Sequence, residues 1–290
     1  IDQVRDAMVA LGFDEAMTLS VVESGWIAPF RPWTNAAPLA TSTPVLRGAN
    51  QLRQSLLPSL LAARRANETL SNRVIELFEI AEVYLPQPAD LPDQRRMLGI
   101  SSGGDFLELK GVIETLLSSI APGAKLVAKP CDSPLFVAGR GAELRLGESL
   151  LGFMGEVGQK ACELFELREG GTVAEIDVSV LIEAAVLVRR ASELSTFPPV
   201  GRDLNIVVDE NIHWADIEGI VRTGCGELLE SLAFQEEFRS KEKLGLGKKS
   251  LLFSIQLRSA TSTLTNEQAD QVRDKLVAEL EKHLGGQLRA

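Results

Sequence analysis

The stretch FPPVGRDLNIVVDE, residues 197–210, sets the pattern for the last third of the chain. Its Leu204, Ile206 and Val208 recur at every second position, which is the period of a strand with one buried face. The two prolines near its start cannot continue a helix. The stretch therefore predicts the first strand of a separate C-terminal domain.

A helix and a hairpin are predicted to follow this strand. Apolar residues recur at helical spacing from Trp214, and Gly224 and Gly226 are expected to end that helix. Two further strands should then pair, because residues 251–257 alternate in polarity and the preceding segment has an apolar side. That apolar side is expected to consist of Leu232, Phe234 and Phe238.

A second helix and a short strand complete the pattern. Thr265 and Gln268 match a capping box, and two glycines after Leu284 should end the helix before a strand at 287–289. The apolar stripe of this helix is Ala269, Val272, Leu276, Leu280 and Leu284. The order βαββαβ, with two helices on one face of an antiparallel sheet, is a ferredoxin-like fold. That fold hosts many unrelated functions.

Four segments of this domain resemble the ferredoxin-fold anticodon-binding domain that ends the bacterial phenylalanine-tRNA ligase beta subunit. They read FPPVGRDLNIVVDE, GELLESLAFQEEFRS, GKKSLLFSIQLRS and TLTNEQ. Upstream, LRQSLLPSLL, LFEIAEVYL and DFLELKG are similar, in the same order, to the synthetase-like domain of that subunit. We therefore expect an α+β chain: a degenerate class II synthetase-like α/β domain with an antiparallel sheet and helices at 1–188, a linker at 189–194, and the ferredoxin-like domain at 195–290.

Spacing in the first domain predicts its elements independently of the resemblance. The expected elements are a helix through Leu11, a strand at 16–22, a helix from Leu52 to about Asn67, strands at 74–85 and 97–101, a helix capped by Asp105, a hairpin of 144–146 with 150–154, and a strand at 173–178. A helical pattern that begins directly at Ile1 suggests a piece of a longer protein.

Composition favours a globular protein with two cores. The chain has 290 residues, 45% of them hydrophobic, and a mean hydropathy of +0.07. It has no apolar run near the roughly 20 residues that span a bilayer, and no basic segment followed by an apolar one at its start. We therefore expect a cytoplasmic location and no membrane partner. Cys131, Cys162 and Cys225 are odd in number and far apart, so we expect reduced, buried thiols.

The charge distribution directs attention to one loop. A net charge of -10 argues against unspecific binding of nucleic acid, yet residues 239–249 hold five basic side chains and one acid. Unpaired RNA bases stack on aromatic rings while lysine and arginine bind the backbone. The candidate RNA-binding residues are Phe197, Arg202, Phe238, Arg239, Lys241, Lys243, Lys248 and Lys249. The alternative is that the two phenylalanines belong to the core and Arg202 pairs with a carboxylate.

The resemblance implies that the first domain is related to a catalytic core whose active members hold ATP phosphates with a strand arginine. Residues 76–83 read ELFEIAEV and contain no arginine, and their carboxylates would repel a triphosphate. We therefore expect no catalytic residue and no metal ligand here. The resemblance further implies an alpha subunit as partner, in a heterotetramer of two alpha and two beta chains, with the tRNA for phenylalanine as ligand and ATP and Mg²⁺ as cofactors of the complete enzyme only.

Other charged and aromatic residues of the first domain have structural interpretations. Arg53 is expected to orient the following helix, although active relatives contact substrate at this position. Arg64 and Arg65 should lie on a solvated helix face, and Arg73 is a weak substitute for the missing strand arginine. Strand alternation places Glu76 and Glu82 on one face and Glu79 on the other, so they do not form a metal site. The aromatic residues of the early loop, expected to order it or to contact another subunit, are Trp26, Phe30 and Trp33.

Two further functions compete with RNA binding. A ferredoxin-like domain that senses a small amino acid favours a glycine-containing loop after its first strand, whereas this chain has Asp209, Glu210 and Asn211 there. A freestanding interaction protein derived from the synthetase subunit is the third possibility. The histidines, His213 and His283, are expected to serve as surface or capping residues. The basic hairpin loop favours RNA.

Overall fold

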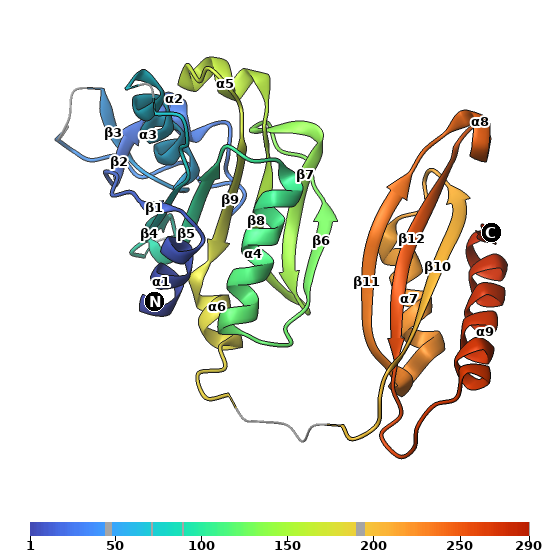
Figure 1. Ribbon diagram of the computed structural model, residues 1–290. Coiled ribbons are helices and arrows are strands. Elements are labelled where there is room, and N and C mark those ends of the chain that lie inside the picture. Colours follow the sequence, from blue (N-terminus) through green and yellow to red (C-terminus); the bar gives the residue numbers. More distant parts are fainter. Residues whose placement is uncertain (44–47, 71, 89, 190–194, 290) are drawn as a thin grey trace. The chain divides into compact units, whose positions relative to one another are not determined.

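The computed structural model describes residues 1–43, 48–70, 72–88, 90–189 and 195–289 (Figure 1). The chain divides into two compact units, Ile1–Arg189 and Arg190–Ala290. Apart from Arg189, the predicted linker lies outside the described residues. Each unit is described by itself.

The strands of the first unit are β1 (Asp14–Glu15), β2 (Val21–Glu23), β3 (Ala49–Leu52), β4 (Leu77–Leu85), β5 (Asp93–Ser102), β6 (Leu126–Pro130), β7 (Phe136–Leu146), β8 (Ser149–Val157) and β9 (Thr172–Asp177). Seven of them form a sheet of order β1-β4-β5-β9-β8-β7-β6, and β2 pairs with β3. β1 is parallel to β4, and the other neighbours are antiparallel. The unit is therefore organised around one large mixed sheet.

Helices cover both faces of this sheet. They are α1 (Asp2–Ala10), α2 (Ser24–Ile27), α3 (Leu57–Thr69), α4 (Phe106–Ile120), α5 (Gln159–Phe165) and α6 (Val178–Ala184). Ile113 of α4 shares a core with Leu98 and with residues of α1 and α6. On the opposite face, Leu60 of α3 shares a second core with Val173 and with residues of α5. Figure 1 shows α4 running along the sheet in this unit.

Several predicted elements of this unit are confirmed within a few residues: the first helix, both long central strands, the hairpin β7/β8 and strand β9. Asp105 caps α4 as expected, since its carboxylate accepts hydrogen bonds from Leu107 N and Glu108 N, and Glu108 Oε2 accepts one from Asp105 N. β6, which pairs with β7, was not predicted.

Two boundaries in this unit differ from the prediction because side chains bind the backbone there. The helix predicted from Leu52 begins at Leu57, where Ser55 Oγ accepts a hydrogen bond from Leu57 N at 3.1 Å. The prediction of a strand at 16–22 was wrong for residues 16–20, which lie in the gap between β1 and β2. Within the gap, Thr18 N donates to Glu79 Oε1 at 3.1 Å instead of to a neighbouring strand.

The second unit has the predicted βαββαβ order. Its elements are β10 (Val200–Asp209), α7 (Trp214–Cys225), the 3-10 turn η1 (Gly226–Leu228), β11 (Leu229–Phe238), α8 (Lys241–Leu244), β12 (Lys248–Leu257), α9 (Asn266–Leu284) and β13 (Gln287–Leu288). The sheet order is β11-β12-β10-β13, with all pairs antiparallel. The predicted capping box of Thr265 and Gln268 opens α9, and Gly285 ends it at φ +63°. The predicted apolar positions of β10 and β12 are buried.

The second strand of this unit corrects the sequence interpretation. β11 carries irregularities between Leu229 and Ser231 and between Phe234 and Glu236. The second one inserts Gln235 as an extra residue, because Phe234 pairs with Phe253 and Glu236 with the adjacent Leu252. Phe238 consequently pairs with Ser250, on the face opposite to Phe253. The prediction that Leu232, Phe234 and Phe238 share one side was wrong for Phe238.

Arg64 and the cysteines also differ from expectation. Arg64 is buried, with 6% of its surface exposed, and so does not lie on a solvated helix face. The three thiols are free, but only Cys225 is buried, and this burial raises its pKa to about 11. Within the residues that the structure describes, no helix combines the length and apolar character needed to cross a membrane.

Candidate nucleic-acid interface

The sheet of the second unit has one face packed against helices and one without them. Leu204, Phe253 and Ile255 point to the buried face, where they share a core with Ile217 of α7 and Leu276 of α9. Pairing assigns alternate residues to the other face. In the register of the sheet, this face carries Asp203, Asn205 and Val207 of β10, Ala233, Glu236 and Phe238 of β11, and Ser250, Leu252, Ser254 and Gln256 of β12. We call it the open face.

Phe238 lies at a small hollow near one end of the open face. The hollow has a volume of about 190 Å³ and is lined by Asn205, Glu236, Phe238, Lys243, Ser250, Leu252 and Arg289. The guanidinium carbon of Arg289 lies 5.1 Å from the centroid of the Phe238 ring, and Lys243 Nζ lies 5.9 Å from it. Both distances fall within the range of cation–π attraction. An aromatic ring and two cations therefore meet on an otherwise polar surface.

The basic loop is more nearly neutral than its sequence suggests. Arg239 forms ion pairs with Glu210 and Glu237, and hydrogen bonding to Glu210 is the main reason that its pKa is raised. Lys248 Nζ lies 3.3 Å from Asp209 Oδ1. The net positive charge of residues 239–249 is thus partly neutralised by carboxylates from β11 and from the end of β10, which lie outside this range.

The other lysines of the loop differ in exposure and pairing. Lys249 is 6% exposed, and its Nζ lies 3.6 Å from Glu237 Oε2. Lys241 and Lys243 are exposed, and among the described residues no carboxylate lies within ion-pair distance of either. These two are the cations of the loop that are best placed to meet an incoming anion.

Arg202 and Phe197 lie apart from this hollow. Arg202 pairs in register with Ile255, five positions along β12 from Ser250, a separation of roughly 17 Å at the usual rise per residue. Its Nε donates to Asp270 Oδ1 at 2.9 Å, and this bond is the main cause that lowers the pKa of Asp270. Phe197 is half-buried, and its carbonyl oxygen accepts a hydrogen bond from Arg258 Nη1 at 2.6 Å. The candidate residues therefore form two groups.

Sequence reasoning missed Asn205 and Arg289. Asn205 occupies one of the alternate positions of β10, and its Oδ1 accepts a hydrogen bond from Ser250 Oγ. Arg289 comes from the far end of the chain, and its N donates to Asn205 O at 2.8 Å. The available signal was the short last strand, since its pairing with β10 is what brings a terminal arginine to the ring of Phe238.

In the first unit, the sheet face under α3 carries carboxylates that the chain itself binds. Glu79, Gly99 and Glu175 are neighbours across three strands, in register. Glu79 is buried, with its Oε1 3.1 Å from Arg53 Nη1 and its Oε2 accepting from Thr18 Oγ1 at 2.6 Å. A Cβ on Gly99 would lie 2.8 Å from Leu60 Cδ1, so α3 closes over this row. Arg53 acts here as a structural partner of Glu79.

Glu175 holds the early loop and the start of α3 on the same face. Its carboxylate accepts hydrogen bonds from Trp33 Nε1 at 2.5 Å, Ser55 Oγ at 3.0 Å and Leu56 N at 2.5 Å. Complete burial outweighs these bonds and raises the pKa of Glu175 to about 7. Trp33 also packs edge-on against Phe153, with 5.2 Å between the ring centroids. The aromatic loop is therefore part of the packing of this unit.

These residues do not fit ATP or Mg²⁺. A triphosphate site needs cationic donors at an open face, whereas this face is covered by α3 and its arginine is committed to Glu79. No group of three side chains suited to a metal ion occurs among the described residues. Glu82 forms an ion pair with Arg96 at 3.1 Å and takes no part in the buried row.

Comparison with known proteins assigns each unit separately. The model of the phenylalanyl tRNA synthetase beta chain CLM domain matches residues 1–178, and that of the ferredoxin-fold anticodon binding domain matches residues 195–289. A phenylalanine-tRNA ligase beta subunit of Rhodopirellula baltica is 39% identical over 295 residues, which cover 98% of this chain and 43% of that protein. The corresponding subunit of Clostridium acetobutylicum is 30% identical over 297 residues, covering 99% of this chain and 37% of that protein.

A solved structure of a pyrrolysyl tRNA synthetase from Desulfitobacterium hafniense is 20% identical, with a TM-score of 0.49, and covers 62% of this chain and 64% of that chain. The chain spans less than half the length of the two beta subunits that it matches.

Proposed function

The chain belongs to the phenylalanine-tRNA ligase beta subunit family, and from that premise we propose that it is the C-terminal part of such a subunit and that its second unit binds tRNA. In this proposal the complete enzyme attaches phenylalanine to its tRNA in the cytoplasm. The observation that carries the tRNA-binding role is the open face, on which Phe238 lies near two cations.

The open face suits an unpaired RNA base better than a duplex. A base can stack on the exposed side of Phe238, while Lys243 and Arg289 attract the adjoining phosphates. Asp203, farther along this face, would repel phosphate there. We therefore propose that the backbone crosses the sheet at the end near α8, where Lys241 is also free to bind.

The remaining predicted residues have supporting roles in this proposal. Arg239, Lys248 and Lys249 add positive potential, but each already has a carboxylate partner in the unbound chain. Arg202, at the other end of the sheet, lies opposite Ile255 on the helical side and bonds Asp270 of α9, so we do not expect RNA on the open face to contact it. Phe197, at the same end, would contact RNA only if the bound loop extends that far. Lys241, Lys243, Phe238 and Arg289 should therefore contribute most of the affinity.

The first unit is proposed to be a degenerate class II synthetase core that supports a catalytic alpha subunit. The carboxylates of its buried Glu79 and Glu175 are bound by donors of the same chain, and α3 packs closely over Gly99 between them. Met17 and Leu19, by contrast, are 98% and 63% exposed, which is costly for large apolar side chains unless another chain covers them. We propose that they contact the alpha subunit, in an assembly of two alpha and two beta chains. The alpha subunit then binds ATP, Mg²⁺ and phenylalanine.

Sensing of a small amino acid is not favoured. The loop after β10 carries Asp209 and Glu210, whose carboxylates pair with Lys248 and Arg239. Such a loop has no glycine to bring backbone N–H groups close to a ligand carboxylate.

The decisive experiment measures binding of labelled tRNA to the assembled heterotetramer containing the complete beta subunit. Phe238→Ala should weaken binding about tenfold, since stacking of one base contributes roughly 1–3 kcal/mol. Phe234→Ala is the matched control, because Phe234 lies on the same strand but packs against Trp214 on the helical side. If both variants bind equally well, or Phe234→Ala alone weakens binding, the open face is not the tRNA site.

A further inference from the structure

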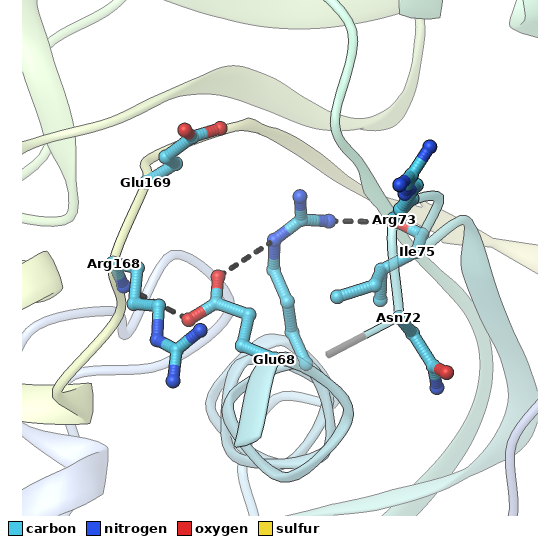
Figure 2. Close-up of a pocket in the computed structure, with 7 residues that line it drawn as sticks. Glu68, Asn72, Arg73, Ile75, Arg168 and Glu169 are labelled. Atoms are coloured by element: carbon cyan, nitrogen blue, oxygen red, sulfur yellow. Dashed lines mark hydrogen bonds and ion pairs between the residues drawn. The ribbon is translucent and has the colours of Figure 1, made fainter. Parts of the chain in front are cut away.

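A second basic site lies in the first unit, at the end of α3. A cavity of about 300 Å³ is lined by Arg64, Glu68, Asn72, Arg73, Ile75, Arg168 and Glu169. Figure 2 shows Arg168 and Glu169 on one side of it and Asn72, Arg73 and Ile75 on the other, with Glu68 on the helix between them. Three arginines from separate segments thus border one hollow.

Arg64 is the unusual member of this group. Its side chain is 8% exposed, and Nη1 donates to Ile75 O at 2.7 Å. Its Nε makes no hydrogen bond and has only a long contact of 3.7 Å with Glu68 Oε1. No hydrogen bond from Nη2 to the described part of the chain occurs either. A buried guanidinium with unused donors is costly unless an acceptor reaches it.

The backbone around Arg64 leaves room for this side chain and for an approaching ligand. A Cβ on Gly103 would lie 3.1 Å from Arg64 Nη2, and one on Gly171 would lie 3.7 Å from its Cζ. Any larger residue at position 103 would press on the guanidinium. The same Cβ would lie 3.3 Å from Glu76 Oε1, so glycine at this position makes room for the side chains of both Arg64 and Glu76.

The other two arginines are available for a ligand. Arg73 and Arg168 are exposed, and no carboxylate within the described ranges lies within ion-pair distance of either guanidinium. Glu68, the carboxylate nearest to Arg64, is already bound, since its Oε2 accepts from Arg168 N at 2.8 Å. The cavity is thus lined by three guanidinium groups and by the carboxylates of Glu68 and Glu169. Of these two carboxylates, Glu68 is the one that accepts a hydrogen bond from the described part of the chain.

We propose that Arg64, Arg73 and Arg168 form a binding site for a phosphate group in the cavity at the end of α3. Guanidinium groups bind phosphate through paired, charge-assisted hydrogen bonds, and the free donors of Arg64 offer one such pair. The cavity is large enough for one or two phosphate groups. Either free pyrophosphate or a phosphate of an RNA backbone supplies this chemistry. The site belongs to the first unit, whereas the proposed tRNA-binding face belongs to the second.

The first test is calorimetric titration of the 290-residue chain with pyrophosphate at low salt. We expect saturable binding that Arg73→Ala combined with Arg168→Ala weakens at least ~10-fold, as the loss of two charge-assisted contacts implies. Both residues are exposed, so the fold should persist. The matched control is Arg65→Ala on the same helix. Arg65 pairs with Glu166 and does not line the cavity, so binding should change less than ~2-fold.

A second variant should change the affinity for pyrophosphate in the opposite direction. Glu68→Gln removes a negative charge beside Arg64 and keeps an oxygen that can accept from Arg168 N. Pyrophosphate should then bind several-fold more tightly, because less repulsion opposes the anion. Weaker binding in this variant would contradict the assignment of Arg64 to the ligand.

The source of the phosphate is distinguished by competition. Displacement of bound pyrophosphate by a short RNA helix identifies an RNA backbone as the ligand, whereas retention identifies a free phosphate compound. The proposal is overturned if pyrophosphate shows no saturation up to about 10 mM, which corresponds to less than ~3 kcal/mol of binding. Equal binding by the double variant and by Arg65→Ala also overturns it.

Discussion

The sheets of the two units differ in whether their polar side chains are buried or left on an open face. In the first unit both faces are covered, and Glu79 and Glu175 are buried with donors from the same chain. In the second unit only one face is covered, and the other presents Asn205, Phe238 and their neighbours. Covering a polar face commits its carboxylates to donors of the same chain, whereas leaving it open keeps hydrogen-bonding groups and an aromatic ring available. The difference supports the proposed binding of tRNA by the open face of the second unit.

The contrast between the two sheets predicts that removing a buried carboxylate lowers the free energy of unfolding. Glu175→Ala leaves the donors of Trp33, Ser55 and Leu56 without an acceptor, and each such group costs about 1–3 kcal/mol. We expect a loss of about 3–5 kcal/mol in the free energy of unfolding, measured by urea denaturation. Asp203→Ala on the open face is the control and should cost less than about 1 kcal/mol. Equal losses would show that the two faces are not different.

The pH dependence of stability should differ in sign between the two units. Folding raises the pKa of Glu175 to about 7, so the folded unit takes up a proton between pH 4.5 and 7. Its contribution to stability is complete below about pH 4.5 and is lost as the pH rises through 7, by about 3 kcal/mol. In the second unit Arg202 lowers the pKa of Asp270, so that contribution is lost as the pH falls instead.

Denaturation of wild type and Glu175→Gln at several pH values measures the first effect. Because glutamine resembles the protonated carboxyl, wild type should lose stability relative to Glu175→Gln as the pH rises from 4.5 to 7. A difference that is independent of pH would mean that Glu175 is ionised throughout. Arg202→Ala should remove only the acidic limb of the curve.

Salt dependence sharpens the picture of the open face. In the assembled enzyme, Lys241→Ala and Lys243→Ala should each reduce the slope of log affinity for tRNA against log salt by about 0.7, as expected for one single-strand phosphate contact. Lys248→Ala and Lys249→Ala should leave the slope nearly unchanged, because their partners are Asp209 and Glu237. Equal changes in all four variants would show that the ion pairs open when RNA binds.

The smallest expected effect is one that the two units share. Asp105→Ala and Thr265→Ala each remove the N-terminal cap of a long helix, α4 and α9 respectively. Each should lower the free energy of unfolding of its unit by about 1 kcal/mol in urea titrations. A loss confined to one unit would mean that the units differ in their helices as well as in their sheets.

Local patterns in the sequence were sufficient for most of the elements. Alternation in β10 and β12, the Asp105 cap of α4 and the capping box of α9 depend on neighbours within a few residues, and all four are confirmed. The start of α3 was misplaced because one of the groups that bind its first N–H groups, Glu175, lies more than a hundred residues away. β6 has no local signal and depends on its pairing with β7.

The candidate site was less predictable for the same reason. The loop lysines were visible as a charge run, but the carboxylates that neutralise three of its bases come from β10, β11 and the turn after β10. Arg289 reaches Phe238 only through the pairing of β13 with β10. Arg64 was expected to be solvated because helical spacing does not reveal that the segment around Ile75 closes over it.

The extra residue in β11 determines how the site responds to the loss of a codon in this strand. Gln235 shifts the alternation of its strand, so the ring that contacts Arg289 is Phe238 and not Phe234. A gene that lost this single codon would remove the bulge but keep the pairs of Phe234 with Phe253 and of Phe238 with Ser250, so Phe238 would stay on the open face. Loss of the codon for Glu237 instead would move Phe238 by one position and turn it toward the helices. In this strand a one-codon deletion at position 237 should therefore be more harmful to the site than one at position 235.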